Sequence, residues 1–147
     1  SMAQDAGTGG AGQEKPRVSD ANSLREAFNG PSAAQGFVLE GVEFQTGSAN
    51  LTSREQVYVS ELSRLMKAQP DARLRITGYT DATGDAATNQ QLSRRRALGV
   101  RDALIRDGVD ASRIEAVGAG AANPIAPNDT PKGRVQNRRI EVQVLGQ

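Results

Sequence analysis

Two stretches of the chain repeat apolar residues at intervals of three and four, the spacing that gathers them on one side of a helix. Thr52 and Glu55 have the spacing of a capping box at the start of the first helix, and Pro70 ends it. The second helix follows a loop at 81–85 and ends at Gly108. The first helix is expected to bury Tyr58, Leu62, Leu65 and Met66.

Strands are predicted where apolar and polar residues alternate, at 73–80 and 140–144, and in two short β-prone runs, 37–44 and 113–118. The segment 119–137 holds three of the six prolines and indicates a long surface loop. The order β-α-β-α-β-loop-β predicts an α/β (α+β) fold. We expect a sandwich in which a mixed four-stranded sheet is backed by two long helices.

The amino-terminal part is expected to lie outside this sandwich. Residues 1–18 are Gly-rich and predict a flexible tether, beginning with Ser1-Met2, a pair typical of a cloning remnant. Residues 19–35 predict a short helix and linker, and residues 36–147 the folded domain.

Composition excludes several kinds of chemistry. The chain of 147 residues has 18 Lys and Arg against 17 Asp and Glu, and this balance disfavours a dedicated nucleic-acid binder. It has no Cys and no His, which removes thiol nucleophiles, His-based acid–base pairs and nearly all zinc sites. No run approaches the ~20 apolar residues of a membrane span. We therefore expect neither a metal nor a cofactor.

Two polar residues lie on the apolar side of the second helix. With Leu92 at 0°, the apolar stripe covers 0° to about 140°, and Arg96 falls at about 40° and Asn89 at about 60°. A guanidinium that faces a core is costly unless it is paired. Asp81 lies at the carboxyl end of the strand before this helix, where ligands bind in α/β sheets.

These three side chains suit a zwitterionic ligand. Arg96 offers a planar fork to a carboxylate, Asp81 accepts hydrogen bonds from an ammonium, and Asn89 can donate and accept. An amino acid head group would satisfy both charges. Two structural alternatives stay open: Asp81 and Arg96 neutralise each other, or Arg96 extends its charged end to solvent.

At the level of motifs, the chain resembles the OmpA-like carboxyl-terminal domain family over about Val38 to Val144. Several separate blocks carry the resemblance in the right order: Gly78-Tyr79-Thr80-Asp81, Gly84, Asn89, Leu92-Ser93, Arg96-Ala97, Val100, Gly118-Ala119-Gly120, Pro124, Asn128, Gly133-Arg134 and Asn137-Arg138-Arg139-Ile140-Glu141. The resemblance implies non-covalent binding of peptidoglycan stem peptides through diaminopimelate. It also implies a periplasmic anchor, tethered to the outer or inner membrane of a Gram-negative bacterium by an upstream segment.

The resemblance also implies roles for single residues. Asp81 would hold the diaminopimelate ammonium, Arg96 its carboxylate, and Asn89 would support the pocket. Further contacts and flanking positions are expected at Thr80, Gly84, Thr46, Gly47 and Arg139, with Arg138 as the alternative to Arg139. Tyr79 stands where many members have His, and Gln45 where many have Asp.

Two other functions are weighed against the wall anchor. A module that binds nucleic acid or another anionic polymer would use the exposed arginines of the second helix, Arg94, Arg95 and Arg101. A hydrolase would use Asp81 and Asp85 as paired carboxylates. The loop between these two residues contains no recognisable oxyanion donors, so we expect no enzyme activity.

Overall fold

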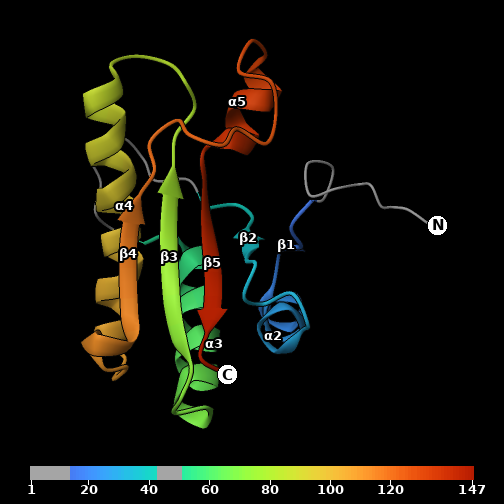
Figure 1. Ribbon diagram of the computed structural model, residues 1–147, viewed down its shortest axis with the longest axis vertical. Helices are drawn as coiled ribbons and strands as arrows, with labels where there is room; N and C mark the ends of the chain where they lie inside the picture. Colours follow the sequence, from blue (N-terminus) through green and yellow to red (C-terminus); the bar gives the residue numbers. More distant parts are fainter. Residues whose placement is uncertain (1–13, 43–50) are drawn as a thin grey trace, which may run out of the picture.

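The computed structural model describes residues 14–42 and 51–147. Within them a five-stranded mixed sheet has the order β1-β2-β5-β3-β4 (Figure 1). β5 is antiparallel to both of its neighbours, and β3 is parallel to β4. The strands are β1 (Arg17–Val18), β2 (Phe37–Leu39), β3 (Arg73–Tyr79), β4 (Ile114–Gly118) and β5 (Arg139–Leu145).

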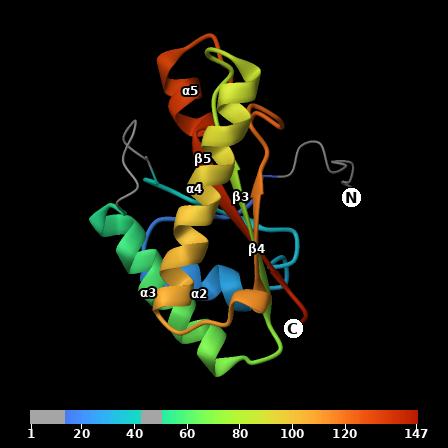
Figure 2. The same cartoon turned by 90° about the vertical axis from the view of Figure 1, so that its left-hand side faces the viewer.

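Helices cover one face of this sheet. α3 lies behind the strands in Figure 1 and to their left in Figure 2, where α4 passes in front of them, and α2 packs beside α3. The helices are α2 (Ala21–Asn29), α3 (Ser53–Ala68), α4 (Ala86–Arg106) and α5 (Pro131–Asn137), with a short 3₁₀ turn, η2 (Ala111–Arg113). The predicted mixed α/β sandwich with two long helices is confirmed.

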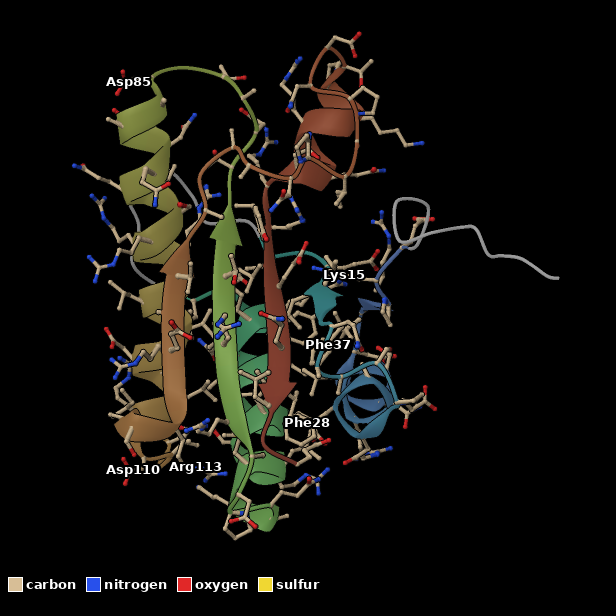
Figure 3. The ribbon with its side chains drawn as sticks, viewed as in Figure 1. Lys15, Phe28, Phe37, Asp85, Asp110 and Arg113 are labelled. Carbon is tan, nitrogen blue, oxygen red and sulfur yellow. The ribbon has the colours of Figure 1, made fainter. Side chains whose placement is uncertain are left out.

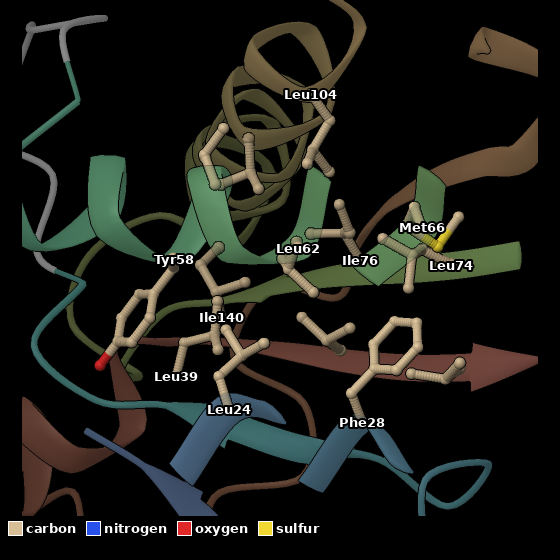
Figure 4. Packing of buried hydrophobic residues seen from close by; sticks show 14 of the residues in the cluster. Leu24, Phe28, Leu39, Tyr58, Leu62, Met66, Leu74, Ile76, Leu104 and Ile140 are labelled. Carbon is tan, nitrogen blue, oxygen red and sulfur yellow. The ribbon is translucent and has the colours of Figure 1, made fainter. Parts of the chain in front are cut away.

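The core lies between the long helices and the sheet. Leu62 and Met66 of α3 and Leu104 of α4 meet Ile76 and Ile140 of the sheet (Figure 4), and all five side chains are fully buried. The apolar side predicted for the first helix is confirmed, since all four expected residues are buried. The opposite face of the sheet carries the polar residues of the alternating strands.

Both ends of α3 are fixed by specific hydrogen bonds. The hydroxyl of Thr52 accepts from the Glu55 amide at 3.2 Å while the Glu55 carboxylate accepts from the Thr52 amide at 2.8 Å, so the predicted capping box is confirmed. At the other end, Arg113 donates to the carbonyls of Met66, Gln69 and Ala72. These bonds tie Arg113 to the end of α3 and to the turn that follows it.

The segment before Gly36 contributes to the same core. Val18 of β1 and Leu24 and Phe28 of α2 are fully buried in it. Asp20 caps α2 through the Ser23 amide at 2.7 Å. β1 adds a fifth strand, so the start placed at Gly36 is not the boundary of the packed unit.

The prediction of a long surface loop at 119–137 is partly wrong. Its last seven residues form α5, capped by the Thr130 hydroxyl, which accepts from the Gly133 amide at 3.0 Å. Pro131 suits the first position of this helix because a proline lacks the amide that would have no partner there. No helix in the described ranges is long and apolar enough to cross a membrane.

Candidate functional site

The predicted site lies at one end of the molecule. β3 ends there, α4 begins there and α5 lies beside them (Figure 1). Figure 3 shows Asp85, the cap of α4, at this end and Arg113 at the opposite end. The loop between β3 and α4 therefore meets the segment around α5, which belongs to a distant part of the sequence.

Thr80 and Asn89 fix the backbone of the β3–α4 loop. The Thr80 amide donates to Gly120 at 2.8 Å, and its hydroxyl donates to the Asp81 carbonyl at 2.8 Å. The Asn89 amide group donates to the carbonyls of Thr83 at 3.0 Å and Asp81 at 3.5 Å. Asn89, which is half-buried, thus ties the start of α4 to the loop.

The Asp81 carboxylate is held from two sides. One oxygen accepts from the Thr83 amide at 2.8 Å, and the other accepts from Arg138 Nη1 at 2.6 Å. Asp81 is only 8% exposed. Burial raises the pKa of this carboxyl, but the hydrogen bonds from Thr83 and Arg138 outweigh it, so the pKa lies below its ordinary value. Asp81 is therefore a fixed anion at neutral pH.

Arg96 is buried on the side of α4 that carries Asn89. Seven residues separate the two, nearly two full helical turns, so both project in almost the same direction. Arg96 is 8% exposed, which confirms that it belongs to the buried stripe of the helix. The structure thus brings Asp81 and Asn89 into contact and places Arg96 on the same side of α4 as Asn89.

Close contact between β3 and α4 sets the position of that helix. A Cβ atom at Gly78 would lie 2.2 Å from the carbonyl oxygen of Ser93, and one at Gly118 would lie 2.5 Å from the amide nitrogen of Arg94. The Ser93 hydroxyl in turn accepts from the Gly120 amide at 2.9 Å. Glycines of the recognised motifs therefore bring the helix against the sheet one turn before Arg96.

The side chain of Arg139 lies in a different environment from that of Arg138. Its guanidinium donates to Glu141 at 2.7 Å and to the carbonyls of Asn137 and Asn123, and it lies 3.8 Å from the centre of the Tyr79 ring. Its side chain is 3% exposed. The structure places Arg138, and not Arg139, against Asp81, which corrects the preference for Arg139 made from sequence.

Asn137 holds the segment that carries Arg138. It is fully buried, accepts from the amides of Ile125 and Ala126, and donates to the Ala126 carbonyl and the Asn128 side chain. Asn128 also accepts from the Ala82 amide at 3.2 Å. This chain of bonds joins α5 to the β3–α4 loop. Asn128 and Asn137 both belong to the motif blocks of the sequence, but the sequence analysis assigned no role to either.

The remaining predicted residues have different outcomes. Gly84 is exposed with φ +87°, a conformation that favours glycine, and it shapes the loop without a side-chain contact. Thr46 and Gly47 lie outside the described residues. A cavity of about 360 Å³ opens on the uncovered face of the sheet beside Tyr79 and Arg139, and neither Asp81 nor Arg96 lines it.

Comparison with known proteins identifies the family of this chain. A sequence model of the OmpA family matches residues 43–138, which is more than half of the chain. The chain belongs to the OmpA family. OmpA-family domains of this type are non-enzymatic anchoring modules, so the hydrolase alternative is excluded.

Relatives of the OmpA-family chain are envelope proteins. It is 44% identical over 101 residues to the probable lipoprotein YiaD of Escherichia coli, covering 69% of this chain and 46% of that protein. It is 37% identical over 137 residues to the peptidoglycan-binding protein ArfA of Mycobacterium tuberculosis, covering 93% and 40%. The chain thus spans less than half the length of these relatives. The names of such relatives, which include the outer membrane porin F of Pseudomonas aeruginosa, support a location in the cell envelope.

Solved structures show the same fold. The peptidoglycan-associated lipoprotein of Burkholderia pseudomallei superposes with a TM-score of 0.66 at 30% identity, covering 71% of this chain and 88% of that one. The carboxyl-terminal domain of Helicobacter pylori MotB gives a TM-score of 0.64 at 25% identity, covering 72% and 83%. The predicted family and fold are confirmed.

Proposed function

We propose that this domain binds peptidoglycan non-covalently through the diaminopimelate of the stem peptide and thereby anchors an envelope protein to the cell wall. The observation that carries the proposal is the fixed, ionised Asp81 beside the face of α4 that buries Arg96. Two relatives, a peptidoglycan-binding protein and a peptidoglycan-associated lipoprotein, support peptidoglycan as the partner.

Diaminopimelate suits this arrangement chemically. In a stem peptide the free end of its side chain carries an ammonium and a carboxylate on one carbon. Asp81 would accept the ammonium and Arg96 would donate to the carboxylate. Asn89, Thr80 and Gly84 would hold the loop in shape, and Thr46 and Gly47 are proposed to add backbone contacts. Binding needs no covalent step.

Hydrogen bonds within the protein already fix the part of the proposed site that carries Asp81. Asp81 is oriented by the Thr83 amide and Arg138, and the loop that carries it is tied to α4, to Gly120 and to Asn128. Such preorganisation lowers the ordering cost of binding. One charged pocket must still offset desolvation, so we propose modest affinity for a single stem peptide and firm attachment only through many contacts with the wall.

The anionic-polymer alternative is not favoured by the structure. Arg94 and Arg95 are exposed. Arg101, expected to be exposed as well, is only partly exposed and donates to the carbonyls of Ile114 and Ala111. A periplasmic location, with attachment to the outer or inner membrane through another part of the protein, completes the proposal.

Co-sedimentation with purified sacculi tests the proposal. Sacculi whose stem peptides contain diaminopimelate should carry the protein into the pellet, and sacculi in which lysine replaces diaminopimelate should not, because lysine lacks the second carboxylate for Arg96. Retention should change little when salt is raised from about 50 to 200 mM, unlike binding through many surface arginines. Protein left in the supernatant with diaminopimelate-containing sacculi would contradict the proposal.

A further inference from the structure

Asn128 joins the segment before α5 to the backbone of the β3–α4 loop. Its side-chain oxygen accepts from the Ala82 amide at 3.2 Å and from the side-chain amide of Asn137 at 2.9 Å. Within residues 14–42 and 51–147, the side-chain nitrogen of Asn128 donates to no other group. The side chain therefore acts as an acceptor that bridges a buried residue and the loop.

The position of Asn128 is fixed independently of that loop. Its carbonyl accepts from Arg134 Nη1 at 3.0 Å. A Cβ atom at Gly133 would lie 1.8 Å from the Pro127 carbonyl oxygen, so α5 packs directly on the residue before Asn128. The fully buried Asn137 also accepts from and donates to the backbone just before Pro127. Asn128 is thus presented to the loop from a rigid support.

Ala82 is the link between Asn128 and the proposed site. It lies between Asp81 and Thr83, and the Thr83 amide donates to the Asp81 carboxylate at 2.8 Å. The Ala82 amide belongs to the planar peptide unit that follows Asp81, so a hydrogen bond to this amide limits how that unit can rotate. The bond to Asn128 therefore restricts the direction in which the Asp81 carboxylate is held.

We propose that Asn128 is a positioning residue of the binding site, because it fixes the peptide unit after Asp81 and thereby the carboxylate that receives the ligand ammonium. This inference rests on the proposed function. Asn128 itself touches no part of the ligand and acts only through Asp81. A site whose charged group is already oriented binds more tightly, since less ordering remains to be done when the ligand arrives.

An NMR titration of the isotope-labelled protein with the tripeptide L-Ala-γ-D-Glu-diaminopimelate tests this role, because it reports the affinity and the Ala82 amide together. Asn128→Ala should bind about fivefold more weakly than the wild type, the order expected for one neutral hydrogen bond. Its Ala82 amide should exchange with solvent faster than in the wild type.

Asn128→Asp is the conservative variant that should restore both properties. A carboxylate has the same shape and keeps an acceptor for the Ala82 and Asn137 donors, so affinity and exchange should match those of the wild type. The head group of diaminopimelate carries one charge of each sign, so the added negative charge has little net effect on the ligand.

Ser63→Ala is the control for a loss of stability alone. Ser63 is buried in α3 and donates to Asp107 at 3.2 Å. Asp107 follows the last residue of α4, whereas the proposed site lies at the start of that helix. The change should lower the melting temperature and leave the affinity for the tripeptide unchanged.

An affinity of Asn128→Ala equal to that of the wild type, or an Asn128→Asp variant that binds as weakly as Asn128→Ala, would overturn the positioning role. If Asn128→Ala does not fold, hydrogen exchange of the wild type decides, because an unprotected Ala82 amide would show that the bond to Asn128 does not hold the loop. Absence of tripeptide binding by the wild type would instead contradict the proposed function.

Discussion

Arg96→Ala is expected to abolish retention of the protein on diaminopimelate-containing sacculi, with at least a tenfold to hundredfold loss of affinity. The arginine is 8% exposed, and the proposed ligand carboxylate would lose its charged donor in a site largely shielded from water. A lost charge-assisted hydrogen bond costs about 1.5–3 kcal/mol, and more if a buried charge is left behind. Asp81→Asn should have a similar effect, since an amide cannot neutralise an ammonium.

Both changes need controls for folding and for general charge. Asp81→Asn is isosteric and keeps an oxygen that can accept from the Thr83 amide but loses the ion pair with Arg138, so the circular dichroism spectrum should stay that of the folded protein while the melting temperature falls. Arg95→Ala removes an exposed arginine from the adjacent position of α4 and should leave co-sedimentation unchanged. Full retention of the Arg96→Ala variant, or equal loss in Arg95→Ala, would refute the assigned roles.

Gly78→Ala is expected to lower the free energy of unfolding by about 3 kcal/mol, the upper end of the usual range for overpacking. Its new Cβ would lie 2.2 Å from the carbonyl oxygen of Ser93, and both groups belong to backbones that cannot simply rotate away. α4 would have to move off β3 and carry Arg96 with it. Urea unfolding followed by circular dichroism measures the change.

Thr77→Val provides the comparison on the same strand. Thr77 lies on the opposite face of β3, pairs with Val117 and Glu141, and is half-buried, so an isosteric change there meets no backbone of α4. It should shift the free energy of unfolding by less than about 1 kcal/mol. Equal stability of Gly78→Ala and the wild type would show that the contact with Ser93 is not required.

Periodic patterns predicted the parts of the fold that bury a continuous apolar face. α3 and α4 are long enough to repeat their apolar residues several times, and Thr52 with Glu55 marked the first of these helices in the sequence itself. β1 contributes two residues and has too few positions to show alternation. α5 has seven residues, only Gly133 and Asn137 are buried, and tertiary hydrogen bonds hold it in place.

The candidate site was predictable to a similar extent. Asp81 stood out because it follows a strand, and Asn89 and Arg96 because they are polar residues on an apolar stripe. The choice between Arg138 and Arg139 could not be made from sequence, since adjacent arginines have the same chemistry. The turn of the chain from α5 into β5 decides it, sending one guanidinium to Asp81 and the other over Tyr79.

Competition for sacculus binding tests the central claim, recognition of an ammonium and a carboxylate on one carbon, most directly. Pimelate is diaminopimelate without its two ammonium groups, and 1,5-diaminopentane is diaminopimelate without its two carboxylates. At equal concentration, only diaminopimelate should release the bound wild-type protein. Equal release by pimelate or by diaminopentane would show that a single charge suffices, and would contradict a site built from Asp81 and Arg96.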